Sequence, residues 1–131
     1  MTIHVQYLSQ VIVRMKFEGD FDDKLIDELD RCLDEQIGNT QKQLFYLIDL
    51  SSYDKITANN ASTVIADKLA ERGDIIANVA FLGQKKIKIK NKDIKAKSEV
   101  FTSDFSAQNW ISDKSRHGFL DHISVKSLLD R

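Results

Sequence analysis

A group of polar side chains follows an apolar segment near the middle of the chain and is well suited to bind an anion or a partner. The segment is residues 44–50, LFYLIDL, and the polar side chains are Asp49, Ser51, Ser52, Thr57, Asn59 and Asn60. A helix that begins near Asn59 would offer free amides and a partial positive charge of about 0.5. Open α/β sheets also bind ligands beyond the carboxyl ends of their strands. In the alternative interpretation, Thr57 and Asn59 only cap the helix and the serines form a turn.

Residues 85–97, KKIKIKNKDIKAK, form a second candidate surface, with seven lysines and one aspartate. The lysines are Lys85, Lys86, Lys88, Lys90, Lys92, Lys95 and Lys97. Such a segment attracts phosphates or anionic lipid headgroups, and its three isoleucines could insert into a membrane or pack beneath the lysines. The alternative is a solvated connection whose isoleucines reach the core. The segment has no arginine and no aromatic residue, so nucleic-acid binding is disfavoured.

Residues 18–35 carry the opposite charge, with nine acidic and two basic side chains. The acidic segment of one copy could meet the lysine segment of another and favour a homodimer. The two segments could equally face each other within one molecule, or face water, and exposed charge pairs stabilise contacts only weakly.

The remaining reactive residue types do not form a catalytic or metal-binding pattern. Cys32 lies on a predicted apolar helix stripe beside acidic neighbours, which favours a structural cysteine. His4 stands far from His117 and His122, and no cysteine lies near them. No nucleophile elbow, phosphate-binding loop or dinucleotide motif occurs. We therefore expect a protein that is not an enzyme and that binds no metal and no cofactor.

The composition is that of a folded, single-domain protein. The chain has 131 residues, 42% of them hydrophobic and 30% charged, and a formal net charge of −1. No overall field therefore draws it to nucleic acid or to an anionic membrane. No apolar run approaches the roughly 18 residues that span a bilayer, and the first residues lack a secretion signal. We expect a cytoplasmic location.

The periodicity predicts alternating strands and helices. Apolar side chains alternate along the second predicted strand, whereas residues 20–37 repeat them at spacings of three and four, as a helix does. Strands are predicted at 3–8, 11–17, 44–50, 75–82 and 100–102, and helices at 20–37, 58–72 and 104–111. Thr57 or Asn59 is the expected N-cap of the second helix.

This order predicts an α/β fold with a mixed, mostly parallel sheet of four to five strands and helices packed against it. Residues 1–113 form the domain, and residues 114–131 form a C-terminal amphipathic extension. Its apolar side chains suggest a short helix that docks on another surface, such as a second copy. They are Phe119, Leu120, Ile123, Leu128 and Leu129.

Residues 8–113 resemble a STAS-type domain, more specifically its SpoIIAA-like subgroup, whose namesake is an anti-sigma-factor antagonist. The resemblance is carried by the hairpin, the acidic helix after Phe17-Glu18-Gly19, the strand ending Asp49-Leu50-Ser51, the Ala80-Phe81-Leu82-Gly83 strand end, and Glu99-Val100-Phe101 before a helix with Trp110. It implies a STAS/SpoIIAA-like sheet, a non-catalytic role and a functional surface after Asp49. Partner-switching members carry a phosphorylatable serine at the start of the next helix. Matching by Val64-Ile65 places Asn60 there, and asparagine cannot be phosphorylated.

The leading interpretation is a non-catalytic, STAS-like regulatory module that binds a protein partner or an anionic ligand at the end of the strand that contains Asp49. The residues of this surface, here called the rim, are Asp49, Ser51, Ser52, Thr57, Asn59 and Asn60. On this interpretation, Asn60→Asp alters partner binding and leaves the fold intact. The alternative is a carrier of an apolar ligand or lipid that contacts anionic membranes through residues 85–97, because the subgroup is also similar to lipid-binding Sec14-type folds.

Overall fold

The computed structural model describes the backbone of residues 2–38, 40 and 42–129, and the side chains of these residues up to Arg116. Its centre is a five-stranded sheet in which the strands lie in the order of the sequence. The strands are β1 (Thr2–Tyr7), β2 (Ile12–Glu18), β3 (Leu44–Asp49), β4 (Ile76–Leu82) and β5 (Ser98–Phe101). β1 pairs antiparallel with β2, and the other three pairs are parallel. The predicted α/β class and mixed, mostly parallel sheet are confirmed.

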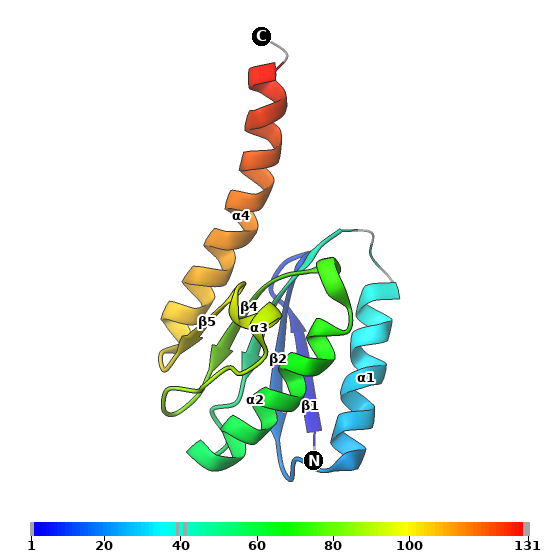
Figure 1. Ribbon diagram of the computed structural model, residues 1–131, viewed down its shortest axis with the longest axis vertical. Helices are drawn as coiled ribbons and strands as arrows, with labels where there is room; N and C mark the ends of the chain where they lie inside the picture. Colours follow the sequence, from blue (N-terminus) through cyan, green and yellow to red (C-terminus); the bar gives the residue numbers. More distant parts are fainter. Residues whose placement is uncertain (1, 39, 41, 130–131) are drawn as a thin grey trace.

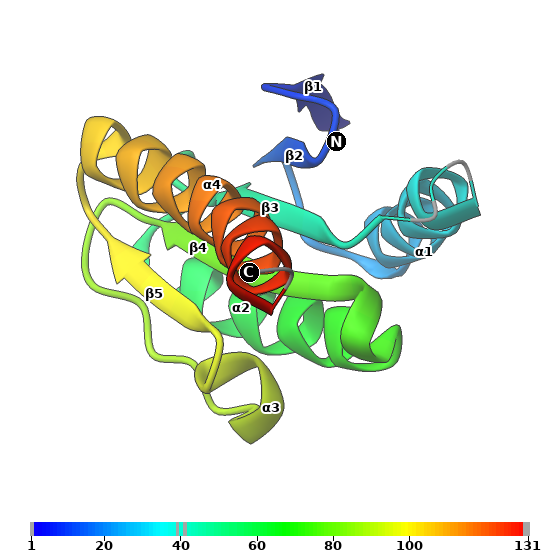
Figure 2. The same ribbon diagram turned by 90° about the horizontal axis from the view of Figure 1, so that it is seen from above.

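Helices cover both faces of this sheet (Figures 1 and 2). Three helices, α1 (Asp23–Gly38), α2 (Lys55–Ala70) and the short α3 (Lys92–Lys95), pack on one face, and a 3₁₀ turn, η1 (Gly73–Ile75), precedes β4. The first part of α4 (Asp104–Leu129) packs on the other face, where Ala107 and Ile111 are fully buried. α3 and η1 were not predicted from the sequence.

The two-residue period of β2 explains why one strand serves both layers. Val13, Met15 and Phe17 lie in the core beneath α1 and α2, whereas Ile12 lies in the core beneath α4. Successive side chains of a strand point to opposite faces. Arg14 therefore shares a face with Ile12 and points toward the α4 layer, which determines what it can contact.

α1 follows its predicted apolar stripe. Leu25, Leu29 and Leu33 are fully buried. Gln36 is also buried, and its Oε1 is satisfied by a 2.8 Å hydrogen bond that it accepts from the Tyr46 hydroxyl. Asp22 precedes the helix, and its side chain accepts a 3.0 Å bond from the Leu25 amide. This bond satisfies one of the free amides at the helix start.

α2 begins at Lys55, three residues before the predicted start, and the prediction of Thr57 or Asn59 as N-cap is wrong. Asp54 is the N-cap, and its Oδ1 accepts a 2.8 Å bond from the Thr57 amide. The apolar pattern did not reveal the first turn because Ile56, its one large apolar residue, is 74% exposed.

α4 is one continuous helix, so the predicted end at residue 111 is wrong and the predicted boundary at 113/114 falls inside the helix. Figure 1 shows its second part extending away from the sheet. Residues 112–118, SDKSRHG, are all polar or glycine, so no apolar period connected the helix that ends at 111 with the apolar side chains further on. The side chains of the predicted amphipathic stripe, from Phe119 to Leu129, lie outside the described residues. Within the described part of the chain, no helix combines the length and the hydropathy needed to cross a membrane.

Candidate functional site

Asp49, the first residue of the predicted rim, is buried and already held by other residues. Its side chain is 3% exposed and accepts a 2.6 Å bond from Arg14 Nη2. Its other oxygen accepts bonds from the amide and the hydroxyl of Ser51, at 3.0 and 2.6 Å. A buried carboxylate needs such partners. Asp49 therefore fixes the start of the loop after β3, whereas Ser52 is exposed beside it.

Arg14 also connects this loop to α4. Its Nη1 lies 2.6 Å from Oδ1 of Asp104, the first residue of α4, and its own side chain is 15% exposed. The Arg14 hydrogen bond, followed by one from Gln108, lowers the pKa of the Asp104 carboxyl against the opposing effect of burial. Arg14, Asp49 and Asp104 thus join β2, β3 and α4 at the carboxyl edge of the sheet. Sequence reasoning missed Arg14 and Asp104.

The start of α2 differs from the anion site that was predicted there. The Asp54 carboxylate occupies this position, and the hydrogen bond from the Thr57 amide lowers its pKa. A carboxylate at a helix N-terminus satisfies the free amides and offsets the helix dipole. Asn59 and Asn60 lie beyond the first turn, and the Asn60 side chain is exposed.

Asn59 connects the rim to the lysine segment. Its Oδ1 accepts a 3.0 Å bond from the Lys88 amide, and its carbonyl accepts bonds from the Ser62 and Thr63 hydroxyls at 2.9 and 3.0 Å. Asn59 therefore holds the irregular chain after β4 against the second turn of α2. The Asn59–Lys88 bond brings these two predicted surfaces together.

The lysine segment places its isoleucines in the core. The three isoleucines are buried: Ile87 is 3% exposed, Ile89 6% and Ile94 0%. The alternative that they reach the core is therefore confirmed, and the prediction that they insert into a membrane is wrong. A Cβ on Gly83 would lie 2.7 Å from Ile87 Cδ1 and 2.9 Å from the Lys85 carbonyl oxygen, so a larger residue there would displace the segment. With the isoleucines facing inward, the lysines between them face solvent.

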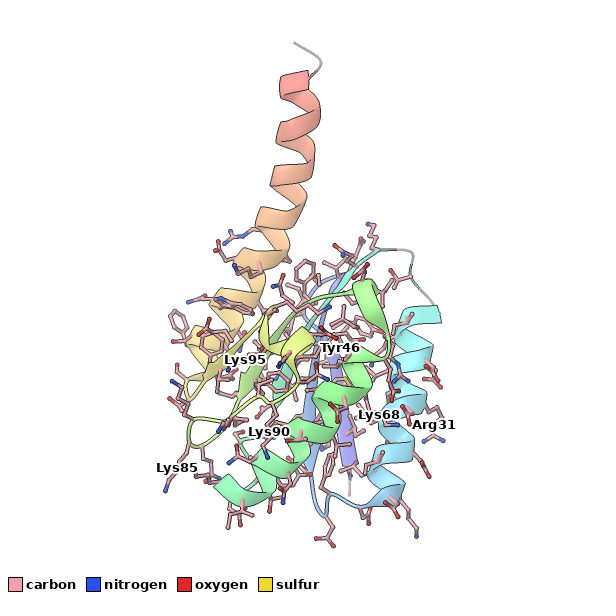
Figure 3. All side chains as sticks on the ribbon, viewed as in Figure 1. Arg31, Tyr46, Lys68, Lys85, Lys90 and Lys95 are labelled. Carbon is pink, nitrogen blue, oxygen red and sulfur yellow. The ribbon has the colours of Figure 1, made fainter. Side chains whose placement is uncertain are left out.

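Six of the seven predicted lysines are exposed, and Figure 3 shows Lys85, Lys90 and Lys95 spread along the connection between β4 and β5. Lys97 differs, because its ammonium donates a 2.6 Å bond to the Ile76 carbonyl and a 3.4 Å bond to the Gly73 carbonyl. Lys97 is therefore a structural residue that holds η1 and β4 beside β5.

A groove of ≈ 650 Å³ lies between the start of α2, the lysine segment and β5. It is lined by Lys55, Asn59, Lys86, Ile87, Lys88, Ile89, Lys95, Ser98, Glu99 and Val100. Four of these side chains are exposed lysines, and one is a glutamate. Among the residues that the structure describes, no carboxylate lies within ion-pair distance of the four lysines. The groove is therefore a surface of net positive charge whose lysines have no ion-pair partner among the described residues.

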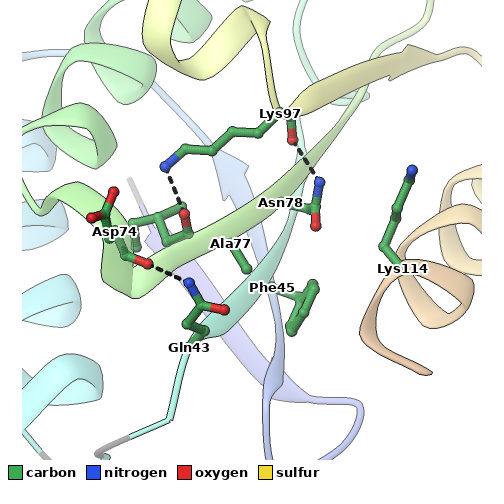
Figure 4. A pocket seen from close by; sticks show the side chains of 8 residues that line it. Gln43, Phe45, Asp74, Ala77, Asn78, Lys97 and Lys114 are labelled. Atoms are coloured by element: carbon green, nitrogen blue, oxygen red, sulfur yellow. Dashed lines mark hydrogen bonds between the residues drawn. The ribbon is translucent and has the colours of Figure 1, made fainter. Parts of the chain in front are cut away.

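A second cavity of ≈ 390 Å³ lies near the amino ends of β3 and β4, beside Lys114 (Figure 4). Its polar groups are mostly used within the protein. Gln43 donates to the Asp74 carbonyl at 2.8 Å, and Asn78 donates to the Lys97 carbonyl at 3.2 Å. Because these donors already have partners, the cavity is a weaker candidate for a ligand site than the groove.

Among the described residues, α1 forms ion pairs with α2 and with Arg72 in the turn after α2, and none with the lysine segment. Asp30 pairs with Lys68 at 2.9 Å and with Arg72 at 3.1 Å, and Arg72 also pairs with Asp34 at 2.9 Å. The charges of α1 therefore partly serve to hold two helices of the same layer together. Association of α1 with a second copy's lysine segment stays a prediction.

Cys32 lies on the inner side of α1, where burial raises the pKa of its thiol and nearby Glu28 and Glu35 raise it further. A thiol of raised pKa is a poor nucleophile at neutral pH. Among the residues with described side chains, no three His, Cys, Asp or Glu residues are grouped as a metal site requires.

Comparisons of the chain with protein-family models, with curated proteins and with solved structures find no match. The α/β class and the five-stranded mixed sheet are properties of the structure itself. The lysine groove, Asn59 and the loop after β3 are accordingly the features from which a function can be argued.

Proposed function

We propose that this chain is a STAS-like, non-catalytic interaction module that binds an acidic segment of a protein partner in the lysine groove beside the start of α2. The observation that carries the proposal is the set of four exposed lysines around one groove, with no carboxylate paired to them in the described structure. Ligand sites commonly have volumes of about 300–1,000 Å³, and this groove falls in that range.

The charge of the groove is local. The four lysines and Glu99 give the lining a formal charge of +3, whereas the whole chain carries −1. A positive cleft on a nearly neutral protein attracts anionic partners to one place and raises their association rate. This arrangement favours a specific acidic ligand over general adsorption to polyanions.

The first turn of α2 also carries an exposed apolar side chain. Ile56 follows Lys55 in the first turn of α2 and is 74% exposed. Apolar anchors beside complementary charges are typical of protein-binding surfaces. The partner segment is therefore expected to contain apolar as well as acidic residues.

A binding role also agrees with the state of the rim carboxylate. The Asp49 carboxylate pairs with the Arg14 guanidinium and accepts bonds from Ser51, so both of its oxygens already have partners within the protein. General acid–base catalysis requires a carboxyl group within reach of a substrate proton. The geometry of Asp49 supports a positioning role in the scaffold.

Fluorescence anisotropy with a labelled peptide of alternating glutamate and leucine tests the proposal. We expect saturable binding that weakens by about tenfold as salt rises from about 50 to about 300 mM, because ions screen exposed lysines. A peptide with lysine in place of glutamate should not bind. Absence of binding at low salt, or an affinity that does not change with salt, would contradict the proposed function.

A second candidate is peripheral contact with an anionic membrane. It is favoured by Lys85, Lys90 and Lys92, which are exposed on the same segment but do not line the groove. Flotation with phosphatidylserine vesicles tests this contact. Organic extraction followed by mass spectrometry tests the related carrier hypothesis, which requires a bound acyl compound.

A further inference from the structure

We propose that two copies of this chain pair through the free edge of β1 and join their sheets into one continuous sheet. Among the described residues, β1 is the first strand in the sheet order and pairs only with β2. Figure 2 shows β1 at the outer edge of the sheet, with no helix beyond it. Its outer backbone groups are therefore open to another strand.

β1 lacks the features that usually protect an edge strand. Its sequence, TIHVQY, contains no lysine, acid or proline, and its pairing with β2 shows no bulge. The opposite edge, β5, has four residues, includes Glu99 and follows the lysine segment. Proteins commonly prevent edge pairing by short strands, charges and bulges. The contrast identifies β1 as the edge that is free to pair.

The backbone register determines which residues of β1 face outward. The Leu8 amide donates a 2.9 Å bond to the Ile12 carbonyl, so these two residues form a hydrogen-bonded pair of the hairpin. In an antiparallel pair, residues alternate between bonding to the partner strand and pointing away from it. The amides and carbonyls of Ile3, Val5 and Tyr7 therefore point away from β2.

The side chains of these same three residues share one face of the sheet, the face covered by α1. Ile3 is buried, whereas Val5 and Tyr7 are 40% and 54% exposed. Val5 lies opposite Met15, and Tyr7 opposite Val13, and both partners are fully buried. An added strand would therefore continue an existing apolar layer.

A second copy provides a strand that matches this edge in the spacing of its outward-facing backbone groups and in its apolar side-chain face. In an antiparallel pairing centred on Val5, each Val5 faces Val5 of the second copy, and each Ile3 faces Tyr7. All three outward-facing residues then bond to outward-facing residues, and apolar side chains meet on one face. A register shifted by two residues forms only two pairs between outward-facing residues, instead of three. The edge is thus self-complementary in one preferred register.

Sedimentation velocity over about a hundredfold range of protein concentration tests the pairing. A single strand edge is small beside a standard interface of about 1,600 Å², so we expect a reversible, concentration-dependent dimer. Val5→Lys should abolish it, because two ammonium groups would face each other at the centre. Ile56→Lys, which changes an exposed apolar residue far from β1 in the sequence, should leave it intact.

A cysteine pair tests the register independently of the effect on stability. In a Cys32→Ala background, Val5→Cys should form an intermolecular disulfide, because facing Cα atoms are about 5.5 Å apart in a hydrogen-bonded pair. Gln6→Cys is the control, since Gln6 would face His4 and two copies of residue 6 would be too far apart. A monomer at every concentration, a dimer that survives Val5→Lys, or equal cross-linking of the two cysteine variants would overturn the proposal.

Discussion

Replacing Arg14 by leucine is expected to lower the free energy of unfolding by about 3–5 kcal/mol, because removal of one partner of a buried ion pair leaves the other charge uncompensated. Asp49 would lose its 2.6 Å contact while remaining buried, and Asp104 would lose its bond at the start of α4. Urea denaturation followed by circular dichroism measures the change.

The matched control is the double variant Arg14→Leu with Asp49→Leu. Replacing both partners of a buried pair by apolar residues is often close to neutral, so this protein should regain most of the lost stability. If Arg14→Leu alone were as stable as the wild type, or if the double variant were less stable than the single one, the assigned role of the ion pair would be wrong.

Reversing two charges of the groove is expected to weaken binding of the acidic peptide strongly. Lys86→Glu with Lys88→Glu changes the formal charge of the lining by four units and places carboxylates where the ligand carries its own. At about 1 kcal/mol for each lysine contact with an anionic surface, the affinity should fall by at least about thirtyfold. Fluorescence anisotropy at low salt measures this change. Both side chains are exposed, so the fold should be unaffected.

Lys24→Glu with Lys42→Glu provides the control of equal charge change. These lysines are exposed but do not line the groove. When both double variants are compared at about 0.1 M salt, this variant should keep the wild-type affinity within about threefold, since exposed charges separated by more than a Debye length of about 10 Å are then largely screened. Equal losses in the two double variants would mean that net charge, and not the groove, governs binding.

The parts of the fold that depend on local patterns could be predicted from the sequence. The alternation in β2 identified its two faces, and the spacing of apolar residues in 20–37 predicted the helix whose inner side holds Leu25, Leu29 and Leu33. The apolar segment 44–50 was predicted as a strand, and every residue of β3 is buried, as an apolar run favours. Each of these signals lies within one element, where periodicity is directly visible.

The features that depend on distant contacts could not be predicted. Arg14 and Asp104 are 90 residues apart, and only the packing of α4 on the sheet brings them together. Asp54 is of a residue type that favours the N-cap position. The first turn of α2 was nevertheless missed, because Ile56, its one large apolar residue, is exposed and does not belong to the apolar stripe of the helix. The lysine run was recognised as a surface, whereas Lys55, which completes the groove, comes from a different part of the chain.

The rim residues show the same division. Asp49, Ser51 and Asn59 were selected from one continuous stretch of sequence. Asp49 and Ser51 lie at the carboxyl end of β3, and Asn59 lies in the second turn of α2. Their roles depend on partners elsewhere in the chain, because Asp49 bonds to β2 and Asn59 bonds to the segment after β4. Sequence alone therefore indicated these polar residues, while the contacts show that Asp49 holds the loop after β3 and that Asn59 holds the lysine segment.

Mapping of amide chemical shifts during titration with the glutamate–leucine peptide tests the central claim most directly. The largest changes should fall on Lys55, Asn59, Lys86, Lys88 and residues 98–100, and they should fade as salt is added. The amides of β1 should stay unchanged, because that edge is assigned to a different partner. Changes that centre on α1 or on the cavity beside Lys114, with the groove unaffected, would contradict the assignment of the binding surface.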